Sequence, residues 1–262
     1  MTGESLSRLD RGEMMLKGKT AIVTGAARGL GREFVRVLSA AGAKIMAADL
    51  NDCSETLALA EGDVASIRLD VTDMVSAQAA ADATVERFGG IDILVNNAAL
   101  YGGMTGGRFE KIDAAEWDLA MSVNVKGIWH CCKAAVPAMR RAGGGSIVNI
   151  SSVAALYGTP YALHYTTSKA AVIGLTRGLA RELGPEGIRV NAIAPSAVLT
   201  EGTRQFFGDR LDKSLTHIAG NQAIHRNLMP SDISGAVLWL ASDQSGFVTG
   251  QTIAVDGGTV ML

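Results

Sequence analysis

The segment TGAARGLG at residues 24–31 decides the fold, because it joins a short β-branched run to an amphipathic stretch. The preceding run, TAIVTG at 20–25, is typical of a buried strand. Glycines between a strand and a helix let the backbone approach a pyrophosphate, which the free N–H groups and the helix dipole stabilise. Gly25, Gly29 and Gly31 are spaced more widely than in G-x-G-x-x-G, but they can form the same kind of pyrophosphate-binding loop.

Short β-branched runs and longer Ala/Leu/Arg-rich stretches alternate from Lys19 onward, which predicts βα units around a parallel sheet. The expected strands are 20–25, 44–49, 66–70, 91–97, 145–152, 188–195 and 251–258. We therefore predict an α/β fold with a single doubly wound Rossmann-type domain and a seven-stranded parallel sheet. Its expected bounds are 17–262, after a flexible N-terminal extension at 1–16, with a substrate loop at about 198–228.

The composition excludes several functional classes. A formal charge of -2 and the lack of a dense Lys/Arg run give no electrostatic footprint for nucleic acid or an anionic membrane. The cysteines, Cys53, Cys131 and Cys132, form no CxxC pair, which suits a reducing compartment and encodes no metal cluster. No run approaches the roughly 20 apolar residues that span a bilayer. We expect a cytoplasmic protein with a small-molecule substrate, no metal, no nucleic acid and no membrane.

Asp49 strengthens the case for a dinucleotide site, because it ends the second expected strand 18 residues beyond Gly31. A carboxylate there can accept hydrogen bonds from both ribose hydroxyls of NAD, and it repels the 2′-phosphate of NADP. Asp49 could instead serve as a helix N-cap or turn residue. Arg28 argues for NADP, since a cation in this loop could meet the phosphate, but it could equally be a solvated surface charge. The sequence favours NAD.

Tyr165, Lys169 and Ser152 form a candidate catalytic group. Tyr165 and Lys169 are i and i+4, so on a helix they share one face, and Ser152 ends the fifth strand thirteen residues before Tyr165. All three can thus meet at the carboxyl edge of the sheet. Lowering the pKa of a phenol from near 10 to about 7 needs roughly 4 kcal/mol of phenolate stabilisation. The Lys169 ammonium and an oxidised nicotinamide ring can supply that.

Together these motifs resemble the short-chain dehydrogenase/reductase family, from about Lys17 to the C-terminus. The motifs are TGAARGLG at 24–31, Asp49, LDV at 69–71, NNAA at 96–99, Asn124 in SVNVKG, ISS at 150–152, YTTSK at 165–169 and IAPSAVLT at 193–200. The resemblance implies hydride exchange between a nicotinamide cofactor and a carbonyl/alcohol pair. It also implies a homotetramer, with the seventh strand and residues 255–262 at a subunit interface.

The resemblance assigns a role to each catalytic residue. Tyr165 takes the alcohol proton in oxidation or gives it in reduction, and Ser152 hydrogen-bonds the reacting oxygen. Lys169 also holds the nicotinamide ribose. Asn124 holds a water that links Lys169 to solvent, although it could instead cap a helix or satisfy buried backbone.

The resemblance also assigns the cofactor contacts. Asp70 is expected at the adenine, Thr200 at the carboxamide, and Asn96 in the cofactor cleft. The other expected cofactor-binding residues are Gly25, Arg28, Gly29, Leu30, Gly31, Asp49, Val71, Asn97, Ala98, Tyr165, Lys169, Pro195 and Val198. The chain departs from the family pattern at Ala99 and Ser196, where glycine is usual, and both changes bear on the substrate pocket.

Several residues compete for these roles. Tyr157 and Tyr161 lack a lysine four residues on, and only the thirteen-residue spacing favours Ser152 over Ser151. His164 precedes Tyr165 and could line the pocket mouth. The remaining candidates are read as packing (His130, Cys131 and Cys132) or as surface and substrate-loop residues (His217 and His225).

The substrate pocket is expected from the loops at 100–109, 153–164 and 198–228. Their apolar side chains are Leu100, Tyr101, Met104, Leu156, Tyr157, Leu163, Phe206 and Phe207. They favour an apolar or aromatic secondary alcohol or its ketone. There are three alternatives. The first is an NADP-dependent 3-oxoacyl-carrier-protein reductase, which Asp49 opposes, and the second is a non-catalytic NAD-binding protein, which the intact catalytic set opposes. The third is a metal-dependent alcohol dehydrogenase, for which the sequence has no set of metal ligands.

Overall fold

The computed structural model describes residues 15–261 and contains one parallel sheet in the order β3-β2-β1-β4-β5-β6-β7. The strands are β1 Thr20–Thr24, β2 Lys44–Asp49, β3 Val64–Arg68, β4 Ile93–Asn96, β5 Gly145–Ile150, β6 Ile188–Pro195 and β7 Thr252–Val255. The α-helices are α1 Gly29–Ala40, α2 Ser54–Leu59, α3 Met74–Phe88, α4 Ala114–Met121, α5 Gly127–Ala142, α6 Ala154–Tyr157, α7 Leu163–Leu183, α8 Glu201–Phe207, α9 Leu211–Gly220 and α10 Pro230–Ala241. The predicted α/β fold and its seven-stranded parallel sheet are confirmed.

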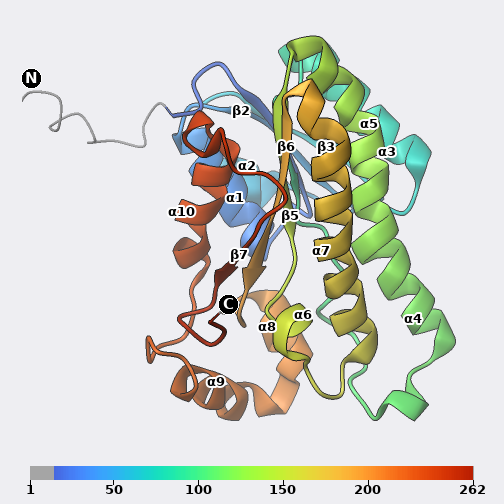
Figure 1. Ribbon diagram of the computed structural model, residues 1–262, viewed down its shortest axis with the longest axis vertical. Helices are drawn as coiled ribbons and strands as arrows, with labels where there is room; N and C mark the ends of the chain where they lie inside the picture. The colour runs from blue at the N-terminus through green and yellow to red at the C-terminus, as the bar shows by residue number, and fades with distance from the viewer. Residues whose placement is uncertain (1–14, 262) are drawn as a thin grey trace, which may run out of the picture.

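Helices cover both faces of the sheet (Figure 1). One apolar core lies between the sheet and α3, α5 and α7, and the other lies between the sheet and α1 and α10. Because both faces are covered, the central strands read as continuous apolar runs rather than alternating ones. All five residues of β1 are buried, for example. The edge strand β7 is only half-buried along its length.

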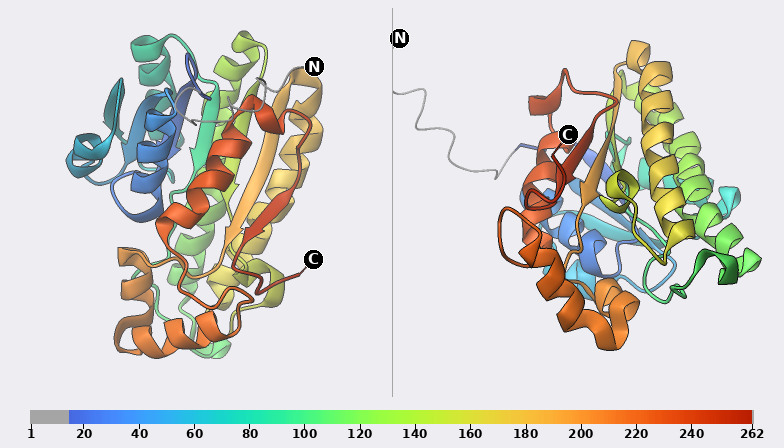
Figure 2. Two further views of the ribbon diagram at one scale, coloured as in Figure 1. Left: turned by 90° about the vertical axis from the view of Figure 1, so that its left-hand side faces the viewer. Right: turned by 60° about the horizontal axis from the view of Figure 1, so that its bottom comes forward.

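The strand order reverses between β1 and β4, which places a crevice between the loops that follow these two strands. The helices α6, α8 and α9 lie beyond the same carboxyl edge, below the sheet in Figure 1. Figure 2 shows α8 and α9 projecting past this edge from the rest of the molecule. The topology therefore gathers the strand ends and the expected substrate loop in one place.

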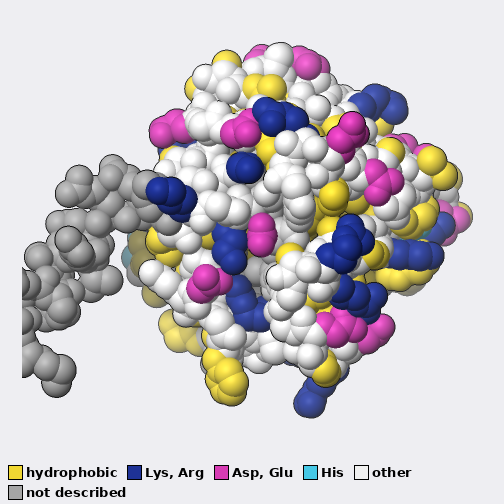
Figure 3. All heavy atoms as spheres, turned by 90° about the horizontal axis from the view of Figure 1, so that it is seen from above, with side chains coloured by type: hydrophobic (Ala, Val, Ile, Leu, Met, Phe, Trp, Pro, Cys, Tyr) yellow, Lys and Arg dark blue, Asp and Glu magenta, His cyan; other side chains and the backbone are white. Residues whose placement is uncertain are grey.

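The packed domain begins earlier than Lys17. Leu16 is fully buried, its N–H donates to the Ala41 carbonyl at 3.0 Å, and Met15 packs against the same core. The rest of the expected N-terminal extension, 1–14, lies outside the described residues. Within residues 15–261, no helix is long and apolar enough to cross a membrane. At the amino edge of the sheet, Lys and Arg side chains lie interspersed with Asp and Glu (Figure 3).

Candidate active site

A cavity of about 960 Å³ opens at the carboxyl edge of the sheet. It takes in nearly all the residues expected to bind a cofactor. Those on its wall are Gly25, Arg28, Gly29, Leu30, Asp49, Asp70, Val71, Asn97, Ala98, Tyr165, Lys169, Pro195, Val198 and Thr200. Ala99 and Ser196, the two departures from the family pattern, line it as well.

The glycine loop has a backbone that other residues would strain. Gly25 and Gly29 have φ values of +65° and +56°, and a Cβ on Gly25 would lie 2.8 Å from Cα of Ala98. Gly31 differs, because it does not line the cavity. A Cβ there would collide with the carbonyl oxygen of Gly25. Its role is thus to let α1 pack directly against the loop, and the expected direct contact with a cofactor is not supported by its position.

Asp49 is held at the end of β2 by backbone and side-chain donors. Its Oδ2 accepts the Ala27 N–H at 2.9 Å, and its Oδ1 accepts the backbone N–H and side-chain amide of Asn51 at 2.9 and 3.1 Å. The carboxylate is fixed on the cavity wall, with the exposed Arg28 on the same wall. Asp49 and Arg28, the two residues that bear on the choice between NAD and NADP, therefore line the same cavity.

Asp70, after β3, is fixed in a similar way. Its Oδ1 accepts the backbone N–H and the hydroxyl of Thr72 at 2.9 and 2.7 Å, and these hydrogen bonds lower the pKa of the Asp70 carboxyl. Thr200 is the N-cap of α8, where its hydroxyl faces the N–H of Thr203 at 3.3 Å. Both side chains line the cavity from opposite ends of the sheet's carboxyl edge.

The two asparagines at the end of β4 have separate roles. Asn97 lines the cavity, and its amide donates to the carbonyls of Thr24 and Gly25 at 2.9 and 3.0 Å, which ties the end of β4 to the glycine loop. Asn96 is buried instead, and its amide donates to Asn149 at 2.9 Å. The expectation that Asn96 lines the cofactor cleft is wrong, because successive strand residues point to opposite faces.

Tyr165, Lys169 and Ser152 all line the cavity, two from α7 and one from the end of β5. The Lys169 ammonium is buried, donates to the Ile150 carbonyl at 2.8 Å and lies 5.8 Å from the centre of the Tyr165 ring. The competing Ser151 is buried, and its hydroxyl donates to the carbonyl of Lys169 at 2.8 Å. Both serines line the cavity, but the Ser151 hydroxyl is already engaged in joining β5 to α7.

Burial dominates the electrostatics of this group. It raises the pKa of the Tyr165 phenol well above its ordinary value, with the neighbouring Tyr101 adding to the rise and a hydrogen bond with Ser152 opposing it. Burial also lowers the pKa of Lys169 to about 8. In the chain without the oxidised nicotinamide that was expected to act with Lys169, burial outweighs any lowering of the phenol pKa. The phenol is therefore in its protonated form, which suits a proton donor.

Asn124 lies in a π-helical turn, Ser122–Lys126, between α4 and α5. The side chain is completely buried: Oδ1 accepts the Leu100 N–H at 2.7 Å, and Nδ2 donates to the Leu100 carbonyl at 3.2 Å and to the Ser168 hydroxyl at 2.9 Å. Asn124 does not line the cavity. It ties the loop after β4 to α7 beside Lys169, at a kind of helical defect that occurs frequently at functional sites.

Aromatic rings form the wall around Tyr165. The ring centre of Tyr101 lies 5.2 Å from that of Tyr165 and 4.7 Å from that of Phe206, on which it stacks. Phe206 in turn meets Phe207 edge to face at 5.2 Å. Of the expected pocket residues, Leu100, Tyr101, Tyr157, Phe206 and Phe207 line the cavity, whereas Met104, Leu156 and Leu163 do not.

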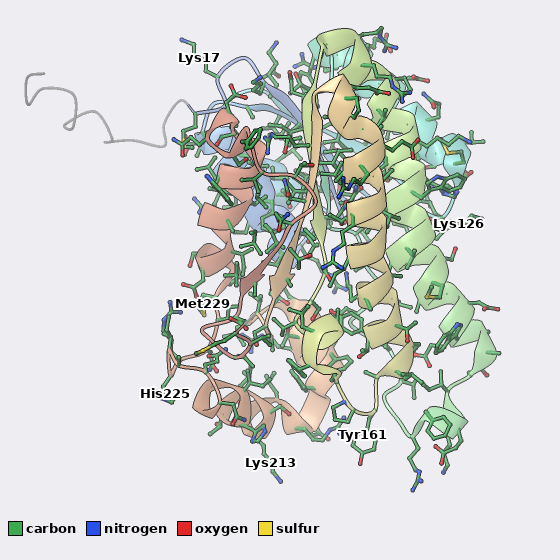
Figure 4. The ribbon with its side chains drawn as sticks, viewed as in Figure 1. Lys17, Lys126, Tyr161, Lys213, His225 and Met229 are labelled. Carbon is green, nitrogen blue, oxygen red and sulfur yellow. The ribbon has the colours of Figure 1, made fainter. Side chains whose placement is uncertain are left out.

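Sequence reasoning missed part of the wall. Residues that it did not single out include Thr159, Pro160, Arg210, Lys213, Ser214 and Ile218 within the expected loops, and Leu50 and Asn51 outside them. Four of these belong to the segment around α9, where 210, 213, 214, 217 and 218 follow the spacing of one helix face. That periodicity was the available signal. Figure 4 shows Lys213 on α9 at the same end of the molecule as Tyr161, which precedes α7.

The histidines and cysteines fall into three groups. His130, Cys131 and Cys132 are buried on α5, as expected of packing residues, and the thiols are free. His217 lines the cavity and His225 is exposed on a loop (Figure 4). The expectation that His164 lines the pocket mouth is wrong. It is completely buried, with Nε2 3.7 Å from Oε1 of Glu116. Within residues 15–261 no cluster of three metal-ligating side chains occurs.

Comparisons with known proteins agree with this arrangement. The family described as enoyl-(acyl carrier protein) reductase matches residues 25–260. The chain is 42% identical over 255 residues to the trans-4-hydroxycyclohexanecarboxylate dehydrogenase of Sinomonas cyclohexanicum, covering 92% of each chain. It is 36% identical over 253 residues to a 3-oxoacyl-[acyl-carrier-protein] reductase of Thermotoga maritima, covering 95% of this chain and 100% of the other. The crystal structure of levodione reductase matches with a TM-score of 0.88 and 31% identity, over 92% of this chain and 97% of the other.

Proposed function

Because the chain belongs to the short-chain dehydrogenase/reductase family, we propose that it is an NAD-dependent oxidoreductase acting on a secondary alcohol or its ketone. One observation carries the proposal: Tyr165, Ser152 and Lys169 converge on the same cavity as the glycine loop and Asp49. A proton donor, an oxygen-binding hydroxyl and a dinucleotide cradle thus share one space. The intact set also argues against a protein that keeps the fold without the chemistry.

The residues present fit a nicotinamide dinucleotide. The positive φ angles at Gly25 and Gly29 expose backbone at the start of α1, where a pyrophosphate is stabilised. Asp49 would hold the adenosine ribose, and Lys169, 5.8 Å from the centre of the Tyr165 ring, and Thr200 would hold the nicotinamide end. A bound oxidised nicotinamide supplies the acceptor for the hydride that leaves the carbinol carbon.

Tyr165 moves the proton in this scheme. In reduction, the phenol gives its proton to the carbonyl oxygen as the C–H bond forms. In oxidation, the phenolate takes the proton from the alcohol O–H. Ser152 donates a hydrogen bond to the same oxygen, where negative charge grows during reduction. Lys169, held to the Ile150 carbonyl, favours the phenolate electrostatically once substrate and cofactor exclude water.

We propose Asn124 as a positioning residue. Its hydrogen bonds to Leu100 and Ser168 support the role of joining the loop after β4 to α7. The water that the family resemblance expects at Asn124 would have to share these donors and acceptors.

We propose NAD rather than NADP on the position of Asp49. At about 4 Å and an effective dielectric near 20, its carboxylate and a 2′-phosphate charge repel by roughly 4 kcal/mol, equivalent to two to three orders of magnitude. Asp49→Ser should remove most of this preference. Asp52→Ser is the matched control, because Asp52 is exposed nearby and does not line the cavity. The ratio of kcat/KM for NAD and NADP measures the effect, and equal values for the unaltered enzyme would contradict it.

The aromatic wall supports a substrate with an apolar or aromatic body. The relative that acts on trans-4-hydroxycyclohexanecarboxylate is in keeping with an alicyclic secondary alcohol. The test is the formation of NADH, followed at its absorption band, across a panel of alicyclic and aryl secondary alcohols. Tyr165→Phe protein provides the blank. If no member of the panel gave turnover above that blank, the proposed substrate class would be wrong.

A 3-oxoacyl-carrier-protein reductase is the second candidate. It is favoured by the relative of that name, and Arg28 on the cavity wall could receive a 2′-phosphate. Asp49 opposes it. Oxidation of NADPH by an acetoacetyl thioester, measured beside the alcohol panel, separates the two candidates.

We also propose a cytoplasmic homotetramer. The half-buried edge strand β7 leaves a side of the sheet for a subunit contact, and the three free thiols suit a reducing compartment. Sedimentation of the purified protein tests the assembly.

A further inference from the structure

One face of α9 carries polar groups into the outer part of the cavity. Lys213, Ser214 and His217 of α9, and Arg210 directly before its first residue, all line the cavity, and their spacing is that of one side of a helix. Arg210 and Lys213 are exposed, so their charged ends are free to meet a ligand that enters from solvent. Within residues 15–261, neither forms an ion pair. Two cations without an ion-pair partner among these residues therefore line this part of the cavity.

The carboxylates of the cavity lie elsewhere. Only Asp49 and Asp70 line it among the described acidic residues; Asp49 ends β2 and Asp70 comes after β3, on one side of the sheet. Ser152 and α8 follow β5 and β6, on the other side. The two carboxylates thus stand on the side of the proposed dinucleotide, together with Arg28, whereas the substrate side carries Arg210 and Lys213 and, among the described residues, no carboxylate. The substrate side differs from the amino edge of the sheet, where the two signs are interspersed (Figure 3).

An apolar stretch separates the cations from the reacting group. The ring centre of Phe206 lies 6.4 Å from that of Tyr165, and Tyr101 stacks on Phe206. Arg210 follows Phe206 by four residues along the chain and begins the polar face. A molecule reaching from Tyr165 to this face therefore needs an oxygen at one end, an apolar body, and an anionic group at the other.

We propose that the substrate is a secondary alcohol or ketone that carries a carboxylate or sulfonate at the far end of an apolar body, and that Arg210 and Lys213 bind this anion. Ser214 and His217 add polar contacts at the same end. Guanidinium and ammonium groups hydrogen-bond such oxyanions directly. The inference rests on the proposed dehydrogenase function and concerns the end of the substrate that takes no part in hydride transfer.

The test compares 4-hydroxycyclohexanecarboxylate with its methyl ester, which has the same ring and carbinol but no charge. The unaltered enzyme should favour the acid by roughly tenfold or more in kcat/KM. Arg210→Gln and Lys213→Gln should each reduce this ratio about three- to tenfold, and the double variant should abolish it. Lys213→Glu should turn the preference toward trans-4-aminocyclohexanol. Turnover of the ester should stay within about twofold in every variant, which also shows that the variants fold.

Arg204→Gln is the matched control, because this exposed cation lies on α8 but does not line the cavity. It should leave the acid/ester ratio unchanged. If the ratio of the unaltered enzyme were near one, or survived the double variant, the proposal would be overturned. It would also fail if the double variant weakened binding of NADH or NADPH while the ratio persisted, because the cations would then serve the cofactor.

A second measurement keeps the proposal independent of turnover. Cyclohexanecarboxylate, which lacks the hydroxyl, should raise the Tm of the unaltered protein with NADH present but not that of the double variant. Its methyl ester should raise neither Tm by as much. An equal shift in both proteins would overturn the anion site. Absence of turnover with every alcohol, together with a shift confined to the unaltered protein, would reject the proposed reaction and uphold the anion site.

Discussion

The two halves of the cavity are built differently. The proposed cofactor side is shaped mainly by backbone groups. Glycines with positive φ form its loop, and the main-chain N–H groups of Ala27, Asn51 and Thr72 hold the carboxylates of Asp49 and Asp70. On the substrate side the wall is made of side chains from the loop after β4 and from α8 and α9. Backbone geometry depends on a few glycines and changes little when neighbouring side chains change, whereas a side-chain wall changes with each substitution. We therefore expect the first half to set the cofactor class and the second to set the substrate.

The sharpest separation of the halves should come from Tyr165→Phe. It removes the transferable proton and keeps the ring, so kcat should fall by about 10³-fold while the Kd for NADH stays within about twofold. In the unaltered enzyme, oxidation should speed up and reduction slow down as pH rises, because burial raises the pKa of the phenol and oxidation needs the phenolate. Stopped-flow rates against pH check both statements. The control is Tyr161→Phe, which alters an exposed tyrosine before α7 and should change neither kcat nor the Kd for NADH.

Cofactor binding should be weakened when Gly31 is replaced by a larger residue. A methyl group on this residue would collide with the carbonyl oxygen of Gly25, so Gly31→Ala should push α1 away from the loop and weaken NADH binding by about 100-fold. Gly178→Ala in α7 is the control, because a Cβ there meets nothing within 4 Å and alanine gains up to about 1 kcal/mol of helix propensity. Fluorescence titration with NADH measures the first and urea unfolding the second. Normal NADH affinity in Gly31→Ala would show that the loop can relax.

Lys169 stands where the halves meet, and its charge is costly. Burial lowers its pKa from 10.5 to about 8, so between these values the unfolded chain binds more protons and the free energy of unfolding rises with pH. The penalty is fully present below pH 8 and amounts to about 3 kcal/mol. Lys169→Met keeps the stem but loses the bond to Ile150, worth about 1 kcal/mol. The variant should therefore be inactive yet about 2 kcal/mol more stable at pH 7.

Urea unfolding at pH 7 and pH 10 distinguishes this account from a simple packing effect. The advantage of the Lys169→Met variant should shrink at pH 10, where the wild-type lysine is largely neutral in the folded protein. A constant difference at both pH values would argue against a cost of charge.

The substrate half should respond to Phe206→Ala with the smallest effect. Removing the ring that stacks on Tyr101 should raise KM for an alicyclic alcohol by about tenfold and leave the Kd for NADH unchanged. Phe207→Ala is a useful partner, because Phe207 contacts Phe206 but is not stacked on Tyr101. Equal losses from both variants would mean that α8 had unfolded rather than that a contact had been lost. Circular dichroism of both variants would reveal such unfolding.

The sequence contained enough to locate the strands and nearly all of the cofactor wall, because these depend on local patterns such as the run before Gly25 and the spacing of Tyr165 and Lys169. The sequence alone could not show that Asn97 lines the cavity and Asn96 does not, because this depends on the direction in which each side chain points at the end of β4. It also missed the effect of burial on the Tyr165 phenol, because burial results from Tyr101 and Phe206 folding over the ring from distant segments.

The π-helical turn at Ser122–Lys126 sets the phase of the long helical rod formed by α4, the turn and α5. A π turn holds about one residue more than an α turn, so deleting one residue there would rotate α5 about 100° relative to α4. The core contacts of Cys131 and Cys132 and the tether from Asn124 to Leu100 could then not both persist. The extra residue therefore couples two distant parts of the molecule, because a single deletion in the turn would sacrifice either the packed core or the tethered loop.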